Sequence, residues 1–421
     1  MAPFCLATLG DWLALEYPIM NPRVLAGFVM FLTFFGWGVF FVPMGPYLAK
    51  AFVNDTTVIG IAYGMGPLAA MISPLVAGWL ADRAFSPRKL LAVLGALAGG
   101  LLFLLPYAGT PREFQVGLFL HSLAFFAALP LLNSVVMASL ADPGREFGAI
   151  RLWGTLGWIV SGVAVGSLLP GLLGSDVATQ PIIFQLGGGA LVLMALGASR
   201  LDDPQPKSRS EPAATGGIGR LLGDPKFLLF LVFSVLFCIP LALYYSYANA
   251  FLKSVGVAQT ETFMTAGQVS EVIFLALLPL LATRLTAKTI LLIGMACWSL
   301  RYALFAEFPS SGTALFVAIA LHGACYDFFF VTGTLYADRK APEGLRNTAQ
   351  SVVAWATLGL GLFLGNLLAP FLDGHFITRA ADGTMSFARE FWLYPSLFAL
   401  GLLVVFALVF RDSTRLSQSP K

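Results

Sequence analysis

Charged residues are scarce in this sequence: Asp, Glu, Lys and Arg together make up 11% of the 421 residues. Soluble globular domains carry about 25% of these residues, so the low share argues against an ordinary soluble protein. The net charge of +3 is small and gives no reason to expect a nucleic-acid partner.

Cysteine and histidine are also rare, with four and three residues. The cysteines show no CxxC spacing, which argues against a disulfide framework and a metal site, so we interpret Cys5, Cys238, Cys297 and Cys325 as packing residues. No HExxH string or similar catalytic motif is present, which leaves a polytopic membrane enzyme as a remote alternative. We therefore expect no catalytic residues and no cofactor.

Apolar residues are in excess, at 58% of the chain, and the mean hydropathy is +0.82. Because lipid cannot satisfy free backbone groups, apolar runs of about 20 residues predict transmembrane helices. Twelve such runs lie at 24–47, 58–80, 90–108, 114–140, 150–173, 182–199, 225–252, 262–283, 289–308, 311–336, 346–371 and 390–410. The predicted fold class is an all-α membrane protein with twelve transmembrane helices.

The longest polar stretch, residues 200–224, lies between the sixth and seventh runs and is rich in Pro, Ser and charged residues. This composition is typical of a flexible linker, so we predict two six-helix halves, at 23–199 and 225–410. Residues 1–22 and 411–421 would be tails. The first of these lacks the features of a signal peptide, and translation could begin at Met1 or Met20.

The two halves show weak self-similarity, which is typical of transporters built from repeats. The sequence LADR at 80–83 is echoed by LATR at 281–284, and the fifth and eleventh runs both begin near an arginine, Arg151 and Arg346. We therefore expect the halves to be pseudo-symmetric.

The distribution of Lys and Arg predicts the orientation. If both termini are cytoplasmic, the opposite side receives only Lys50, Arg112, Lys253, Arg379 and Arg389. The sequence thus predicts an integral protein of a bacterial inner (plasma) membrane, in contact with the lipid bilayer and with both termini inside.

The segment GWLADR at 78–83, followed by Arg88 and Lys89, lies in the loop between the second and third runs. It resembles the signature loop of the major facilitator superfamily. Gly78 would permit close helix approach, and Asp82, Arg83 and Arg88 would hold one conformational state, which is a gating role. The alternative is that the basic residues only anchor the topology.

Three charged residues fall at mid-membrane positions of the predicted helices: Glu271, Arg301 and Asp327. A charge at mid-membrane costs about 2.5–3.5 kcal/mol on insertion scales, so such residues usually have a function. Gln268 and Glu271 share a helix face, and a carboxyl group in apolar surroundings can carry a proton near neutral pH. The alternative is a structural ion pair between these acids and Arg301.

Two histidines and a group of tyrosines are further candidates. We expect His121 to make a helix contact, whereas His322 shares a face with Tyr326 and could line a cavity. Tyr245 is a candidate ligand contact, because aromatic faces stack on sugars and bases.

Several strings together resemble the nucleoside:proton symporter family within the major facilitator superfamily. They are FGWG at 35–38, LNSV at 132–135, IRLWGTLGWI at 150–159, QVSE at 268–271, LRYALFA at 300–306 and YDFF at 326–329. The likeness runs from Met20 over nearly the whole chain.

The resemblance implies proton-coupled uptake of nucleosides or nucleoside-like solutes by alternating access, through a cavity between the halves. It implies substrate contacts at Arg151, Thr155, Trp158, Tyr245, Gln268, Glu271, His322 and Tyr326. It also implies that Asp327, with Glu271 as the second candidate, couples transport to protons. A single chain would suffice for function, with a small polar solute and protons as its partners.

The sequence departs from the family in the seventh helix, where a glutamine and an asparagine are replaced by Ala242 and Tyr245, and at His322, where the family has tyrosine. An amide pair is the natural reader of a base edge, so these changes leave the substrate open. A sugar transporter, an exporter of small polar compounds and a solute sensor are the alternatives.

Overall fold

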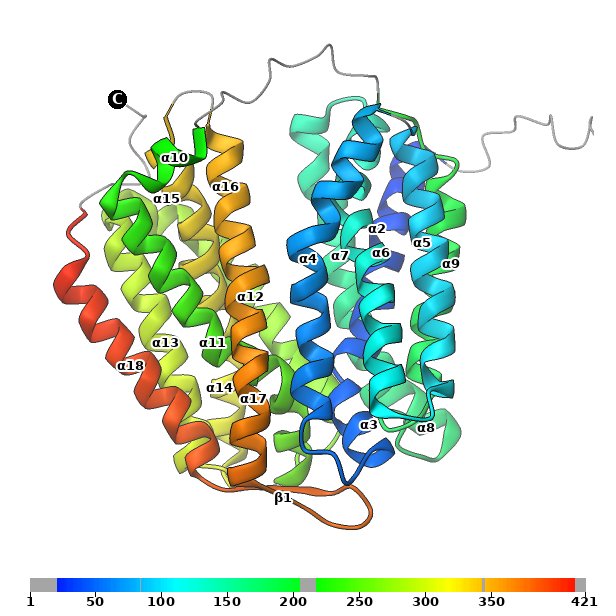
Figure 1. Ribbon diagram of the computed structural model, residues 1–421, viewed down its shortest axis with the longest axis vertical. Coiled ribbons are helices and arrows are strands. Elements are labelled where there is room, and N and C mark those ends of the chain that lie inside the picture. The colour runs from blue at the N-terminus through cyan, green and yellow to red at the C-terminus, as the bar shows by residue number, and fades with distance from the viewer. Residues whose placement is uncertain (1–20, 84, 205–216, 343–344, 413–421) are drawn as a thin grey trace, which may run out of the picture.

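The computed structural model describes residues 21–83, 85–204, 217–342 and 345–412, and it shows two bundles of long helices side by side (Figure 1). One end of the molecule carries the short helix α10, and we call it the linker side. The opposite end carries the hairpin of β1 and β2, and we call it the hairpin side (Figure 1).

The N-terminal bundle contains the elements up to α9. They are α2 (Pro22–Phe41), α3 (Met44–Ala51), α4 (Val58–Arg83), α5 (Pro87–Leu104), η1 (Leu105–Tyr107), α6 (Pro111–Ala138), α7 (Pro143–Val163), η2 (Ala164–Leu168), α8 (Leu169–Leu173) and α9 (Ile182–Ala198).

The C-terminal bundle follows α10 (Gly217–Leu222). It comprises α11 (Pro225–Ser254), α12 (Thr260–Arg284), α13 (Ala287–Glu307), α14 (Gly312–Tyr326), η3 (Asp327–Val331), α15 (Thr332–Lys340), α16 (Arg346–Ala354), η4 (Trp355–Gly361), α17 (Leu362–Phe376), β1 (Ile377–Arg379), β2 (Met385–Phe387) and α18 (Glu390–Val409). The two strands are antiparallel, with Ile377 opposite Phe387.

The predicted helix count is confirmed. Within the described residues, eleven helical segments are long and apolar enough to cross a membrane. The twelfth, α9, has 17 residues, or about 26 Å, slightly less than the roughly 30 Å of a bilayer core. Several continuous spans, such as Gly312–Lys340, consist of two α-helices joined by a π-helix.

Polar caps mark where several helices begin, in three cases a few residues before the predicted apolar run. Ser86, Thr110, Asp142 and Asp224 each accept a hydrogen bond from a backbone N–H in the first turn of the following helix. A proline follows each cap in the first turn, where its missing N–H leaves no hydrogen bond unmade. The first turns of these helices therefore include residues that are not hydrophobic.

The two bundles meet mainly along two pairs of segments: α4 contacts α17 and η4, while α12 contacts α7 and η2. Helix α11 also contacts α3 and α4. On the hairpin side these contacts are close. A Cβ atom at Gly60 would lie 2.7 Å from Pro370, and one at Gly166 would lie 2.5 Å from the backbone nitrogen of Thr262. The structure is therefore closed on the hairpin side.

Close helix packing within the N-terminal bundle depends on glycine. A Cβ atom at Gly157 of α7 would lie 2.3 Å from the backbone oxygen of Phe31 in α2. Small residues let helix backbones approach in this way where the surrounding lipid provides no hydrophobic driving force.

We expect Gly157→Ala to destabilise the protein by about 1–3 kcal/mol, because the new methyl group forces α2 and α7 apart. Gly148→Ala, in the same helix, is the matched control: its Cβ would meet nothing within 4 Å, and alanine should be neutral or slightly stabilising there. Apparent melting temperatures of the detergent-purified variants measure the difference. Equal temperatures for the two variants would contradict the close contact.

Candidate functional site

A small cavity lies between the two bundles and receives side chains from both. Its free volume is about 40 Å³. The residues that line it are Phe41, Val42, Trp158 and Gly162 of the N-terminal bundle and Tyr244, Tyr245, Glu261, Met264, Thr265, Gln268 and His322 of the C-terminal bundle.

One face of α12 forms much of the polar wall. Glu261, Thr265 and Gln268 are spaced by four and three residues, so their side chains lie on the same side of the helix. The neighbouring helix α14 crosses α12 closely, because a Cβ atom at Gly323 would lie 2.5 Å from the backbone of Ser270. This crossing brings His322 against Gly267 and onto the cavity wall.

Aromatic rings form the remaining walls and bridge the two bundles. The ring centre of Phe41 lies 6.0 Å from that of Trp158 and 6.0 Å from that of Tyr245, which belongs to the other bundle. The ring of His322 stacks between Tyr244 and Tyr326, at 5.8 Å from each. Flat aromatic faces of this kind suit a planar or ring-shaped solute.

A second group of charged residues lies nearer the linker side. Arg151 is two turns from Trp158 along α7, and its guanidinium lies 4.3 Å from the centre of the Phe34 ring. Its charge is attracted by that of Glu271 across the boundary between the bundles, and Tyr326 lies nearby. No direct ion pair joins Arg151 to Glu271 among the described residues. The two charges, one from each bundle, therefore attract each other without direct contact among the described residues.

Asp327 is the most isolated acid in the described part of the chain. It is 1% exposed, and neither carboxylate oxygen has a hydrogen-bond partner among the described residues. It begins the π-helix η3, a type of helical bulge that is common at functional sites. Its electrostatic neighbour is Glu271.

Arg301 does not form the ion pair with Glu271 and Asp327 that the sequence left as an alternative. The Arg301 side chain is buried, donates from Nε to the backbone oxygen of Ala318 at 2.9 Å, and lies 4.3 Å from the ring centre of Tyr244. No ion pair links it to Glu271 or Asp327 within the described residues. In the described part of the chain, both acids are therefore without a basic partner in direct contact.

Of the residues that the resemblance implied, Trp158, Tyr245, Gln268 and His322 line the cavity. Arg151, Thr155, Glu271 and Tyr326 do not line it. Arg151, Glu271 and Tyr326 lie near one another, while Thr155 is half-buried one turn from Arg151.

The sequence interpretation missed other residues of the cavity, chiefly Phe41 and Glu261. Glu261 precedes Gln268 by two turns on the same helix face, a spacing that could have revealed it. It lies before the apolar run that predicted the eighth helix, and so was not considered as a mid-membrane charge.

Ala242, where the family has a glutamine, does not face the solute site in the structure. Ala242 is fully buried and packs against Gly365 of α17, so it is not part of the cavity wall. Tyr245, one turn later, does line the cavity.

The gating loop is described only in part. A Cβ atom at Gly78 would meet nothing within 4 Å, so the expected close helix approach is not present there. Arg88 donates to the backbone oxygen of Leu201 at 3.0 Å, a contact within the N-terminal bundle. The side chains of Asp82 and Arg83 lie outside the described part of the structure.

His121 makes the helix contact expected of it, since its Nδ1 lies 2.8 Å from the backbone oxygen of Ala98 in α5. The three described cysteines, Cys238, Cys297 and Cys325, are free thiols, and Cys5 lies outside the described residues. Within the described residues, no three His, Cys, Asp or Glu side chains are grouped so that they could hold a metal ion.

Comparison with known proteins gives consistent matches along the chain. Residues 20–415 match the family described as Nucleoside H⁺ symporter. YegT of Escherichia coli (strain K12) is 34% identical over 94% of this chain and 95% of its own length. Nucleoside permease NupG of the same organism is 24% identical over 93% of this chain and 96% of its own length. Maltose permease of Geobacillus stearothermophilus is 29% identical over 91% of this chain and 94% of its own length.

The crystal structure of nucleoside transporter NupG has a TM-score of 0.82 to this chain. The match covers 93% of this chain and 100% of that chain at 24% sequence identity. The predicted fold, two six-helix halves of the major facilitator type, is confirmed.

We expect Ala242→Gln to lower the free energy of unfolding by about 1–3 kcal/mol, because there is no room for the longer side chain between α11 and α17. Tyr245→Gln is the matched control, since it places the same amide on the same helix facing the cavity. It should change the apparent melting temperature much less. A larger loss for Tyr245→Gln than for Ala242→Gln would contradict the assignment of these two positions.

Proposed function

The chain belongs to the nucleoside H⁺ symporter family, and we propose that it takes up a nucleoside or nucleoside-like solute together with protons. The family and the relatives are transporters, so the membrane-enzyme alternative is excluded. The protein is an integral membrane protein with the helices needed to cross a bilayer.

The observation that carries the proposal is the cavity between the bundles. Its walls combine aromatic rings from both bundles with the amide of Gln268 and the imidazole of His322. Rings can stack on a base, while the amide and imidazole can form hydrogen bonds with base edges or ribose hydroxyls. A cavity of about 40 Å³ is smaller than a nucleoside, so the halves must move apart to admit the substrate.

Arg151, Thr155, Glu271 and Tyr326 extend the proposed binding site toward the linker side. Arg151 and Glu271 belong to different bundles and interact electrostatically without direct contact. A ribose bound between them would accept hydrogen bonds from the guanidinium and donate to the carboxylate. The two halves would then contact the same ligand.

Asp327 is the proposed site of proton coupling, and Glu271 is the second candidate. An ionised carboxylate without a partner is costly in apolar surroundings, and Asp327 has none among the described residues. Proton binding removes this cost and changes the field at Glu271. Entry of one proton supplies about 2.3 kcal/mol per 100 mV, which corresponds to roughly fifty-fold accumulation.

We place the linker side in the cytoplasm of a bacterial cell, with the protein in its inner membrane. The excess of Lys and Arg in the predicted linker-side loops supports this orientation. The structure is then closed toward the outside. One chain contains the whole cavity, so we propose that the monomer is the transporting unit.

We expect proteoliposomes with the purified protein to accumulate radiolabelled uridine or adenosine when an inward proton gradient is imposed. Asp327→Asn should reduce accumulation to equilibration, because the amide cannot take up the proton, while exchange of labelled for unlabelled substrate continues. Asp202→Asn, which also removes one acid but lies exposed after α9, should accumulate like the unchanged protein.

Two outcomes would overturn parts of this proposal. Full gradient-driven accumulation by Asp327→Asn would move the coupling site to another acid. Failure of folded protein to take up either nucleoside, with uptake of maltose instead, would favour the sugar-transport alternative that the similarity to a maltose permease supports.

A further inference from the structure

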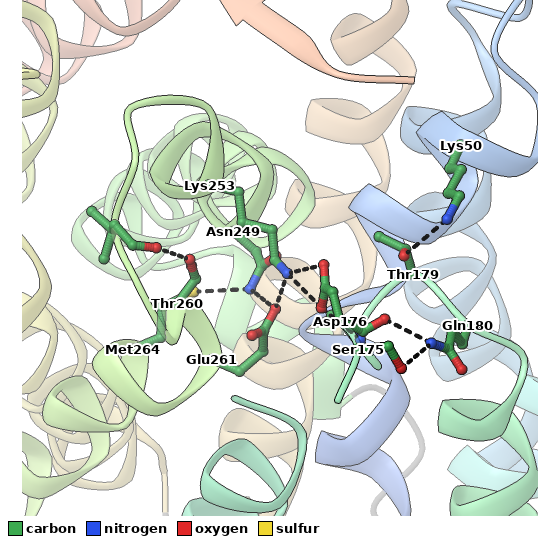
Figure 2. A network of polar contacts seen from close by, with 12 residues as sticks. Lys50, Ser175, Asp176, Thr179, Gln180, Asn249, Lys253, Thr260, Glu261 and Met264 are labelled. Atoms are coloured by element: carbon green, nitrogen blue, oxygen red, sulfur yellow. Dashed lines mark hydrogen bonds and ion pairs between the residues drawn. The ribbon is translucent and has the colours of Figure 1, made fainter. Parts of the chain in front are cut away.

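Polar contacts join the two halves on the hairpin side, beyond the cavity (Figure 2). Nζ of Lys253, at the end of α11, lies 3.0 Å from Oδ2 of Asp176 in the loop between α8 and α9. Ser167 of η2 donates to Oε1 of Gln259 at 3.0 Å and lies 2.6 Å from the hydroxyl of Thr262. These contacts connect segments that are far apart in the sequence.

Lys253 has a second acidic partner within its own half. Its Nζ lies 3.3 Å from Oε1 of Glu261, and Asn249 donates to the same oxygen at 3.0 Å. Lys253 lies in the last turn of α11 and Glu261 in the first turn of α12, where each charge interacts favourably with the helix dipole. Local structure thus places the lysine and this acid together whatever the other half does.

The two ion pairs of Lys253 differ in burial. The Glu261 side chain is 3% exposed, whereas Asp176 is 51% exposed. A buried carboxylate strongly retains its partner, because an unpaired buried charge is costly, while an exposed pair contributes little and exchanges readily with water. The contact with Asp176 is therefore the one that can break reversibly.

Asp176 is held ready for this contact by its own loop. Its Oδ1 accepts from the backbone N–H of Ala178 at 3.0 Å, and its backbone oxygen accepts from the Gln180 side chain at 3.0 Å (Figure 2). The carboxylate keeps its direction when the lysine leaves, and the same contact can form again.

We propose that Lys253, Asp176 and Glu261 form a latch that holds the hairpin side closed and sets the equilibrium between its closed and open states. Lys253 is a positioning residue: it stays with Glu261 and releases Asp176 when the hairpin side opens. Because Glu261 also lines the cavity, one carboxylate connects the latch to the solute site. This inference rests on the proposed transport by alternate opening of the two sides.

The test measures the distance between the two halves directly and needs no substrate. Spin labels are attached to cysteines that replace Asn54 and Ala258, exposed positions on the hairpin side of the N- and C-terminal bundles, after the native cysteines are changed to alanine. Double electron–electron resonance in nanodiscs then gives the populations of short and long distances.

We expect Asp176→Asn to raise the ratio of long to short distances about twofold to fivefold, the range for loss of an exposed ion pair. Asp176→Glu, which keeps the charge, should restore the ratio of the unchanged protein. Lys50→Met is the matched control: it also removes a hairpin-side charge, but the Lys50 side chain bonds to Thr179 within its own half and the ratio should not change.

Lys253→Met should raise the ratio as well, but it leaves Glu261 buried without its cation and can impair folding. The double variant Lys253→Met with Glu261→Gln removes both charges, so it should fold and still show the raised ratio. Ratios equal to that of the unchanged protein in Asp176→Asn and in the double variant would overturn the latch.

Uptake assays on the same variants separate this inference from the proposed function. A shifted ratio in protein that transports no nucleoside supports the latch and contradicts the substrate assignment. Nucleoside uptake with an unshifted ratio supports the transport function and overturns the latch.

Discussion

The structure depends on one constraint: lipid offers no hydrogen-bond partner to the protein backbone. The chain meets it with helices that satisfy their own backbone groups, and nearly all lipid-facing side chains can then be apolar. A charge inside the membrane is tolerated only where it faces the interior. Glu271, Arg301 and Asp327 lie near the middle of their spans, and the two acids among them are the residues for which we propose contact with the solute or a proton.

The two halves meet through irregular helices, and the meeting points are related by the pseudo-symmetry. The fifth span contains the π-helix η2, which contacts α12 of the other half, and the eleventh span contains the π-helix η4, which contacts α4. A π-helix shifts the register of a helix by one residue, so the face presented before it differs from the face after it. In this way one span can pack within its own half and also contact the other half.

The helices could be predicted to within a few residues, because long apolar runs have no other stable structure in lipid. Several of their starts could not, since caps such as Thr110 and Asp142 are polar. Gln268 and His322 were recognised as candidates from one helix at a time. Phe41 was missed because its role depends on a contact across the halves, and Glu261 because it precedes the apolar run that predicted the eighth helix. Lys253 was interpreted only as a topology signal. Its partner Asp176 lies 77 residues away, beyond any local pattern.

The charged residues at the boundary are divided unequally between the halves, which matters for how proton binding could be coupled to their movement. Glu271, Asp327 and Glu261 all belong to the C-terminal half, whereas the N-terminal half presents Arg151 and aromatic rings. Protonation of an acid in one half can drive movement of the other only if it alters an interaction between them. The electrostatic interaction of Arg151 with Glu271 is such a link, and Asp327 influences Glu271 from within its own half. In the proposed mechanism, a proton at Asp327 would therefore change how strongly the halves attract each other around the solute.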